Sequence, residues 1–179
     1  VFADKVKKEL AELSMKNARF EVKFETLDEN TCDETGFDKI EFMFTANAGQ
    51  PLKPLNKVAS GGEMSRFMLA VKNITADIVS VDTMIFDEID AGVSGSASLK
   101  IGRLLRQTAR NRQVFCVTHS PQIAAFADTH LYIEKQTKGD ATFTSIRQLD
   151  EKQRTEEIAR IISGENITET AMQNAFEML

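Results

Sequence analysis

The nine residues "DTMIFDEID" (residues 82–90) decide the fold class of this chain. They place a short apolar run before a group of acids, which is typical of a buried parallel strand with polar residues at its end. A second run of this kind, "QVFCVTH" (residues 113–119), follows a helix predicted over residues 96–111. Strand, helix and strand in this order predict an α/β domain with a parallel core.

Antiparallel additions flank this core on both sides in the sequence. Alternating apolar and polar residues predict half-buried strands over residues 20–25 and 39–46, and a second hairpin from residues 130–136 and 142–149 across "TKGD". Further helices are predicted over residues 1–18, 60–78, 121–129, 154–164 and 168–179. The expected fold class is therefore α/β, with a mostly parallel core sheet, flanking helices and antiparallel additions.

The composition is that of a globular domain with an acidic balance. The 179 residues are 42% hydrophobic and 27% charged, with a formal net charge of −5. This length suits one domain with a sizeable core, or one compact domain with an appendage. The acidic balance argues against a nucleic-acid surface over most of the domain, although it leaves room for a local basic patch. No apolar run approaches the length that crosses a bilayer.

Cysteine and histidine usage gives no sign of a structural metal. Cys32, Cys116, His119 and His130 lack zinc-like spacing, and two free thiols suit a reducing cytoplasm. The first residues show no signal-peptide layout and no initiator Met, and they begin inside a predicted helix. We therefore expect a fragment of a longer protein.

The tetrapeptide "SGGE" (residues 60–63) opens one of the predicted helices. Its S-x-x-E spacing is a capping box, in which Ser60 caps the helix and Glu63 reaches back to it. A cap does not require two glycines, each of which costs up to about 1 kcal/mol relative to alanine in a helix. Gly61 and Gly62 leave backbone N–H groups bare at the positive end of the helix dipole, which suits a phosphate. From these residues alone both interpretations stay open.

Two adjacent carboxylates, Asp87 and Glu88, follow the apolar run that decides the fold. Ligands of open parallel sheets bind at the carboxyl ends of the strands. One acid is suited to hold Mg²⁺, mostly through bound water, and the other is suited to activate an attacking water molecule. Alternatively, either acid only caps the next element. His119 ends the next strand on the same edge, although a lone histidine is more often structural than catalytic.

Taken in order, "SGGE", "FDEIDAGVSG" (residues 86–95) and "VTHSPQIAAFAD" (residues 117–128) resemble the ATPase heads of the ATP-binding-cassette family. In that family these are the signature motif, Walker B with the D-loop, and the switch histidine. Their joint occurrence in order is far more specific than any one motif. Together with "ASGGEMSRFMLAVK" (residues 59–72), they are most similar to the RecN family of bacterial double-strand-break repair ATPases, which are related to SMC proteins. The resemblance covers essentially the whole chain.

The resemblance implies that the signature motif meets a nucleotide held by a second head. Ser60, Gly61 and Gly62 would contact the γ-phosphate of that ATP. Glu63 would support the loop.

The resemblance also implies roles around the strand-end acids. Asp87 would hold Mg²⁺, and Glu88 would be the general base. His119 would sense the γ-phosphate. Asp90 to Ser94 would form a D-loop that crosses the dimer interface, although Ser94 stands where many relatives carry an aspartate. Ala59 likewise replaces a usual leucine.

A missing motif limits what this chain can do. It contains no G-x-x-x-x-G-K-[ST], the loop that cradles the phosphates of bound ATP. In SMC-like proteins that loop lies in the N-terminal half, beyond a long coiled coil. The resemblance therefore implies the C-terminal lobe of a head over residues 20–179, with residues 1–19 as the foot of the returning coiled-coil helix. We predict that this fragment binds ATP weakly and hydrolyses none alone.

The partners implied by the resemblance are ATP with Mg²⁺, a second copy of the head as a homodimer, and the N-terminal half of the same polypeptide. DNA and the recombinase RecA are implied for the full-length protein, in the cytoplasm at the nucleoid and away from membranes. The excess of acidic residues does not itself support DNA binding by this chain. Two alternatives are another cassette ATPase (SMC, Rad50-like or a transporter subunit) and a non-catalytic dimerisation module, which would not need Glu88.

Overall fold

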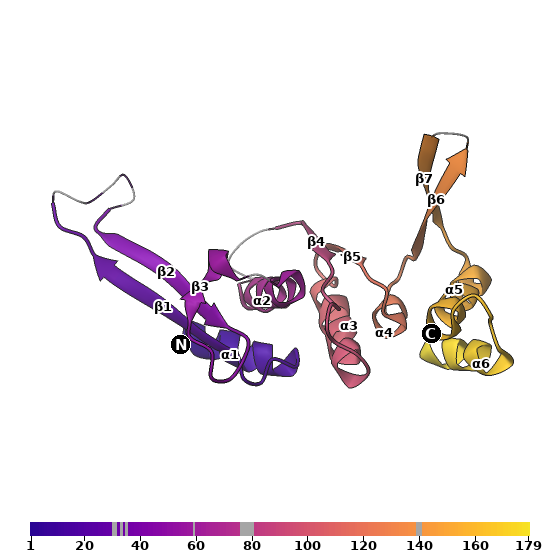
Figure 1. The fold of residues 1–179 in the computed structure, drawn as a ribbon, viewed down its shortest axis with the longest axis horizontal. Helices are drawn as coiled ribbons and strands as arrows, with labels where there is room; N and C mark the ends of the chain where they lie inside the picture. The colour runs from indigo at the N-terminus through magenta and orange to yellow at the C-terminus, as the bar shows by residue number, and fades with distance from the viewer. Residues whose placement is uncertain (30–31, 33, 35, 59, 76–80, 139–140) are drawn as a thin grey trace. The chain divides into compact units, whose positions relative to one another are not determined.

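The computed structural model describes residues 1–29, 32, 34, 36–58, 60–75, 81–138 and 141–179. The chain divides into two compact units (Figure 1). The first unit comprises Val1–Val93 with Arg112–Val117, and the second comprises Ser94–Asn111 with Thr118–Leu179. The predicted α/β class is confirmed, because the described strands form one parallel pair and two antiparallel sheets alongside helices.

The first unit contains an antiparallel sheet in the order β1–β2–β3. Its strands are β1 (Arg19–Thr26), β2 (Asp38–Thr45) and the short β3 (Lys53–Pro54). Phe20 pairs with Phe44, so alternate residues of the two long strands share one face of the sheet. The predicted antiparallel pair is confirmed.

Aromatic side chains form the core under this sheet. Phe20 and Phe44 are at most 1% exposed. The ring of Phe67, on helix α2 (Gly61–Ile74), lies 5.1 Å from each of them, measured between centroids. Since burial of such a side chain contributes about 1.5–3 kcal/mol, these three rings are a main source of stability for the unit.

Helix α1 (Phe2–Glu12) packs against the same core. The apolar side chains of Val6, Leu10 and Leu13 are at most 1% exposed, so they pack within this unit. The helix ends six residues earlier than the predicted Ala18, and Ser14 just beyond it takes the left-handed φ of 65°. A helix cannot continue through such a residue.

The parallel pair of the first unit is β4 (Thr83–Asp87) and β5 (Gln113–Val117). Asp87 pairs with Val117, so the carboxyl ends of both strands meet at one edge, as predicted. β5 ends two residues before its predicted end at His119. Burial alternates along β4, where Met84 and Phe86 are buried and Ile85 is 73% exposed. The prediction of a fully buried strand is wrong for this chain, because only one face of the pair is covered.

The second unit combines helices with a hairpin. Its elements are α3 (Ser96–Thr108), α4 (Pro121–Ala124), β6 (Leu131–Lys138), β7 (Ala141–Gln148), α5 (Glu151–Ser163) and α6 (Glu169–Met178). The predicted β6–β7 hairpin is confirmed, although residues 139–140 of its turn lie outside the described residues. Gly164 ends α5 at a φ of 77°, as predicted. None of the helices in the described part of the chain has the length and apolar character that a membrane crossing requires.

Candidate functional site

Helix α2 begins with the predicted cap. Ser60 has extended backbone angles, and its Oγ accepts a hydrogen bond from the backbone N–H of Glu63 at 3.4 Å. This half of the capping box satisfies one of the N–H groups that a helix start leaves unpaired. The capping interpretation of Ser60 is therefore confirmed. Ala59, just before it, lies outside the described residues.

Gly62 is buried against the loop that follows β4. A Cβ atom on Gly62 would lie 2.8 Å from the Cβ of Ala91 and 2.9 Å from the Ala91 carbonyl oxygen. It would also lie 3.1 Å from the carbonyl oxygen of Glu88. The double glycine left open whether a ligand approaches the helix backbone. At Gly62 the loop after β4 occupies that space, so Gly62 has a packing role.

Gly61 differs from its neighbour because it is exposed. A Cβ atom there would meet only one atom nearby, Oε2 of Glu88, at 3.4 Å, which is an ordinary contact distance. The surface at Gly61 is thus available to a ligand, and the Glu88 carboxylate lies beside it. Of the two glycines, only Gly61 keeps the open backbone that an anion needs.

Arg66 fixes the loop after β4 to helix α2. It lies one turn beyond Gly62 on the same helix face and is 6% exposed. Its Nη1 donates hydrogen bonds to the carbonyl oxygens of Ile89, at 3.2 Å, and Ala91, at 2.9 Å. Burial lowers the pKa of the Arg66 guanidinium, while the carboxylates of Glu63 and Asp90 act in the opposite direction.

A second hydrogen bond joins the helix to the strand end. The Oγ of Ser65 donates to the carbonyl oxygen of Asp87 at 2.9 Å. The first turns of α2 are therefore tied both to the last residue of β4 and to the loop beyond it. The predicted helix terminus and the predicted strand-end acids form one site within the first unit.

The two acids at the end of β4 are exposed. Glu88 has a φ of 53°, a left-handed conformation that costs a non-glycine residue about 1–3 kcal/mol and is found mostly where surroundings enforce it. Among the described residues, no group of three His, Cys, Asp or Glu side chains is placed to hold a metal ion. Asp87 as a single carboxylate fits Mg²⁺, which prefers one or two protein carboxylates together with phosphate oxygens and water.

The remaining predicted residues are spread over both units. Asp90 is 1% exposed and lies near Arg66, so it has a role inside its own chain besides the predicted one. Ser94 lies in the second unit, just before α3. His119 is exposed and also belongs to the second unit, and it follows the end of β5 by two residues where the strand was predicted to end on it. Their roles stay predictions.

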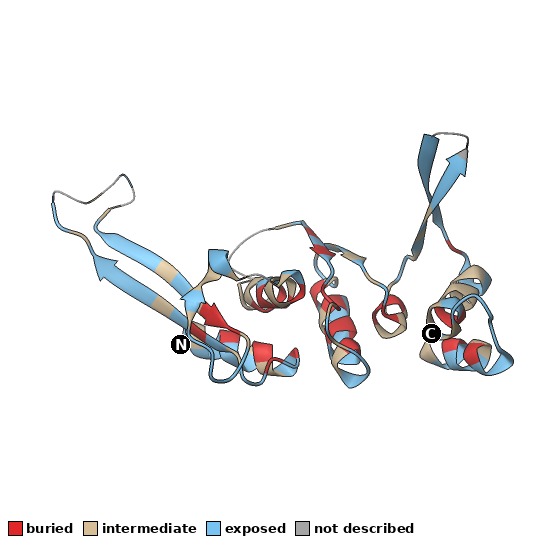
Figure 2. Ribbon diagram, in the orientation of Figure 1, coloured by how far each residue is buried: buried red, intermediate tan, exposed pale blue. Residues whose placement is uncertain are grey.

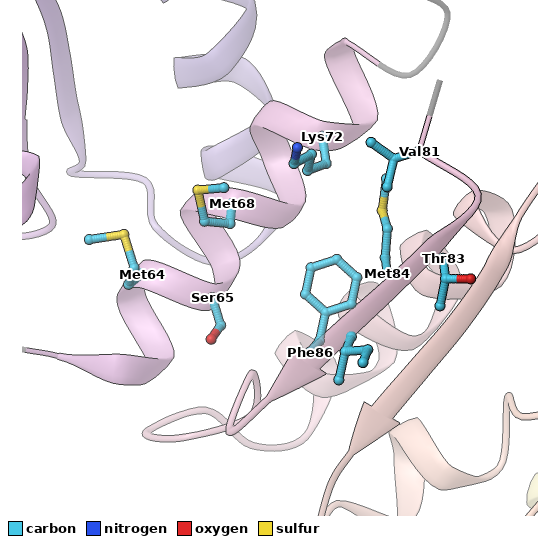
Figure 3. A pocket seen from close by; sticks show the side chains of 9 residues that line it. Met64, Ser65, Met68, Lys72, Val81, Thr83, Met84 and Phe86 are labelled. Atoms are coloured by element: carbon cyan, nitrogen blue, oxygen red, sulfur yellow. The ribbon is translucent and has the colours of Figure 1, made fainter. Parts of the chain in front are cut away.

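A hollow of about 350 Å³ lies between α2 and β4 (Figure 3). The helix contributes Met64, Ser65, Met68 and Lys72, and the strand side contributes Val81, Thr83, Met84, Ile85 and Phe86. The strand-end acids are not among these residues. The hollow therefore adjoins the candidate site, with which it shares Ser65, and does not include the acids.

Part of the apolar surface of α2 is exposed. Met68 is 36% exposed and lines this hollow. The buried face instead includes Gly62, Arg66 and Ala70, spaced by one helical turn. The helix was predicted to extend to residue 78, and residues 76–80 lie outside the described residues.

Comparison with known proteins identifies the family. The chain is 43% identical over 174 residues to the "DNA repair protein RecN" of Vibrio cholerae, which covers 97% of this chain and 31% of that protein. It is 44% identical over 178 residues to the RecN of Halalkalibacterium halodurans, at 98% and 32% coverage. The chain belongs to the RecN family. It spans about a third of the length of these RecN proteins and corresponds to a C-terminal part of them. No protein-family model matches it.

A solved structure supports the fold independently of the RecN sequences. The "Smc head domain with a coiled coil and joint" of Pyrococcus yayanosii matches 88% of this chain and 28% of that chain, with a TM-score of 0.58 at 17% identity. At that identity the likeness shows the fold alone. The predicted fold, part of an SMC-type head, is confirmed, and RecN membership decides against the other cassette ATPases.

Sequence reasoning missed two residues that hold the site together, Arg66 and Ser65. Arg66 carried a usable signal, because an arginine four residues after Gly62 and four before Ala70 falls on a helix face of otherwise small residues. Ser65 carried none, since its partner is the backbone of Asp87, 22 residues away.

Proposed function

We propose that this RecN chain is the C-terminal lobe of an ATPase head, over residues 20–179, with residues 1–19 as the foot of a coiled-coil helix. The full-length protein hydrolyses ATP through a dimer of heads, in double-strand-break repair and recombination in the cytoplasm. One observation carries this proposal. Arg66 and Ser65 tie the amino end of α2 to the strand end and loop that carry Asp87 and Glu88, so one packed unit presents both nucleotide-facing surfaces, in a chain without a P-loop.

In this proposal, α2 faces the nucleotide of a second head. The open backbone at Gly61 and the Ser60 hydroxyl contact the γ-phosphate of that ATP. Gly62 and Glu63 keep the first turn in place, Gly62 by packing on Ala91. Supporting this role, the positive end of a helix dipole and free N–H groups suit a phosphate.

The strand-end acids act on the nucleotide of their own head. Asp87 would hold Mg²⁺, which when bound neutralises phosphate charge. Glu88 accepts a proton from the attacking water, and His119 senses the γ-phosphate. Asp90 to Ser94 form the loop toward the second head. DNA binding by the full-length protein and contact with RecA belong to the same proposal, and they rest on the family resemblance alone.

The exposed face of the β4–β5 pair supports the proposal that another half of the head covers it. Ile85, Phe115 and Val117 share this face and are 73%, 41% and 52% exposed. Parallel strands are nearly always covered on both faces. The N-terminal half of the same polypeptide, which would also bring the P-loop, is the covering part that the proposal requires.

The test compares Glu88→Gln with a matched control in the full-length protein. Loss of a general base lowers turnover by about 10²- to 10⁴-fold. Asp82→Asn makes the same chemical change just before β4, at its opposite end, and should leave turnover unchanged. ATP-dependent dimers, followed by light scattering, should persist in both variants.

Three results would contradict the proposal. Wild-type turnover in Glu88→Gln would remove Glu88 from the chemistry and favour a non-catalytic dimerisation module. An equal loss in Asp82→Asn would mean that the Glu88→Gln effect is not specific to Glu88, which would remove its support for a general base. Hydrolysis well above background by the isolated 179-residue chain would refute the claim that it is half of a head.

A further inference from the structure

A positive segment interrupts the acidic sequence of this chain. Between Asp90 and Asp128 the sequence has no aspartate or glutamate, whereas it has five lysines and arginines. An even spread of the 27 acidic residues of the chain would place about five or six in a stretch of this length. The formal net charge of −5 therefore conceals a strongly uneven distribution of charge along the chain.

Most of these positive side chains lie on one side of helix α3. Arg103 and Arg106 are exposed and lie one helical turn apart, and Lys100 is exposed one turn before them. The opposite side of the helix is buried, and its residues are Ser98, Ile101, Gly102, Leu105 and Thr108. Figure 2 shows buried residues in red and exposed residues in pale blue alternating along α3.

Arg110 extends this positive side just beyond the end of the helix. Its backbone N–H donates a hydrogen bond to the carbonyl oxygen of Gln107 at 3.3 Å, so the chain continues in a turn above Gln107, which is exposed. The path from Lys100 to Arg110 is about 15 Å long at the rise of a helix. We call Lys100, Arg103, Arg106 and Arg110 the basic face of α3.

The carboxylates of the described chain do not neutralise the arginines of this face. Among the described residues, no ion pair joins any of these three arginines to an acidic side chain. Asp128 and Glu151 act instead on Arg154 of α5. Burial lowers the pKa of Arg154, these two acids oppose that shift, and the charge of Arg106 adds to it. The three arginines therefore keep their charge for a ligand from outside this chain.

The composition of the basic face fits a polyanion better than a protein surface. Of the residues of α3, Leu99 is the one large apolar residue that is exposed, at 38%. Stable protein interfaces centre on buried apolar and aromatic side chains, which this face lacks. The planar guanidinium of arginine matches phosphate oxygens in geometry as well as in charge. Duplex DNA carries about one negative charge per 1.7 Å of its axis, so a face of about 15 Å would meet roughly nine of them.

We propose that the basic face of α3 binds the phosphate backbone of duplex DNA without reading its sequence. The proposal rests on the DNA binding proposed above for the full-length protein and gives that binding a surface. A duplex fits better than a single strand, because α3 has no aromatic residue on which an unpaired base could stack. Cover by another part of the protein is disfavoured, because buried cations without matching acids are costly.

A DNA-binding titration of the full-length protein tests the proposal. The glutamine variant combines Arg103→Gln, Arg106→Gln and Arg110→Gln, and the lysine variant places lysine at the same three positions. Fluorescence anisotropy follows the binding of a labelled duplex of about 40 base pairs over a series of salt concentrations, at constant ATP. The measured quantity is the slope of log affinity against log salt concentration.

The expected change follows from the number of phosphate contacts that are lost. Each contact contributes about 0.9 to the slope, so three lost contacts should make the slope of the glutamine variant shallower by about 2.7. Its affinity at about 0.1 M salt should be on the order of 100-fold lower than that of the wild type. The lysine variant keeps the charge and should keep the wild-type slope.

A matched control removes the same charge elsewhere in the second unit. It combines Lys135→Gln on β6, Arg147→Gln on β7 and Lys152→Gln on α5, which are all exposed. Lys152 has the carboxylate of Glu156 within 3.9 Å, and Arg147 lies 4.9 Å from the centre of the Tyr132 ring. The slope of this control should equal that of the wild type.

A double variant, Arg103→Gln with Arg110→Gln, repeats the test if the glutamine variant does not fold. It leaves Arg106 and its neighbour Arg154 unchanged, and its slope should be shallower by about 1.8.

The possible failures can be told apart. A wild-type slope and affinity in the glutamine variant would overturn the proposal, and so would an equal loss in the matched control, because that loss would reflect net charge alone. Tighter binding of a single strand of the same length would overturn the choice of a duplex. A wild-type protein that binds no DNA would refute the DNA binding proposed above, and the basic face with it. ATP turnover is not a readout, so failure of the ATPase proposal would leave this result unaffected.

Discussion

Replacement of Gly62 by alanine separates packing from helix propensity. In an ordinary helix this change stabilises by up to about 1 kcal/mol. Here the new Cβ would meet Ala91 Cβ at 2.8 Å and two backbone oxygens at 2.9 and 3.1 Å. Because two of the three neighbours are backbone atoms, relief requires a shift of helix α2 or of the loop after β4.

The size of the effect follows from two opposing terms. Overpacking costs about 1–3 kcal/mol, and the gain in helix propensity offsets up to about 1 kcal/mol. We expect Gly62→Ala to lower the free energy of unfolding by about 1–2 kcal/mol. With a urea m-value of about 2 kcal/mol per M, the midpoint falls by about 0.5–1 M.

Gly61→Ala is the matched control. It lies in the same helical turn and gains the same propensity, but its Cβ would meet only Oε2 of Glu88 at 3.4 Å, the end of a flexible side chain. We expect its stability to equal or exceed that of the wild type. Urea unfolding followed by circular dichroism compares the three proteins. A Gly62→Ala midpoint at or above that of Gly61→Ala would refute the packing role.

Three further predictions concern residues around and beyond the site. Arg66→Lys should lower the free energy of unfolding by about 1–2 kcal/mol in the same urea assay, since the lysine ammonium does not reproduce the planar geometry in which Nη1 serves the carbonyl oxygens of Ile89 and Ala91. Gly102→Ala on α3 should lower it by about 1–3 kcal/mol, because the new Cβ would overlap the ring of Phe126; an unchanged midpoint would contradict this. Burial, Asp90 and Asp87 raise the pKa of the Cys116 thiol to about 12. Its alkylation by iodoacetamide at pH 8 should therefore be on the order of a thousandfold slower than that of a cysteine peptide, and comparable rates would rule the shift out.

The elements that sequence predicted best are those with a complete local signal. The β1–β2 pair shows strict alternation, and α5 ends on a glycine with positive φ, so type and end were both readable. The early end of α1 was not readable from the sequence. Residues 13–18 carry no proline or glycine, and only the left-handed backbone at Ser14 stops the helix.

Periodicity showed which residues are apolar but not whether this chain covers them. Ile85, Phe24 and Met68 all fit a buried pattern, and all are exposed here. The pattern is a property of the whole folded molecule, whereas this chain spans about a third of the length of its relatives. The proposal that a further half of the head covers the β4–β5 pair rests on this mismatch between apolar pattern and exposure.

The order of the motifs gave a set of site residues whose roles stay predictions, and local rules predicted the cap at Ser60, which is confirmed. Neither was able to give the contact between Gly62 and Ala91, which joins residues 29 positions apart and depends on how the loop after β4 turns. That contact changes the meaning of the double glycine. Gly62 holds the helix end against the loop, and Gly61 alone presents open backbone. Because the helix end is fixed to the loop that carries Glu88, its distance from the acids is set by packing before any ligand binds.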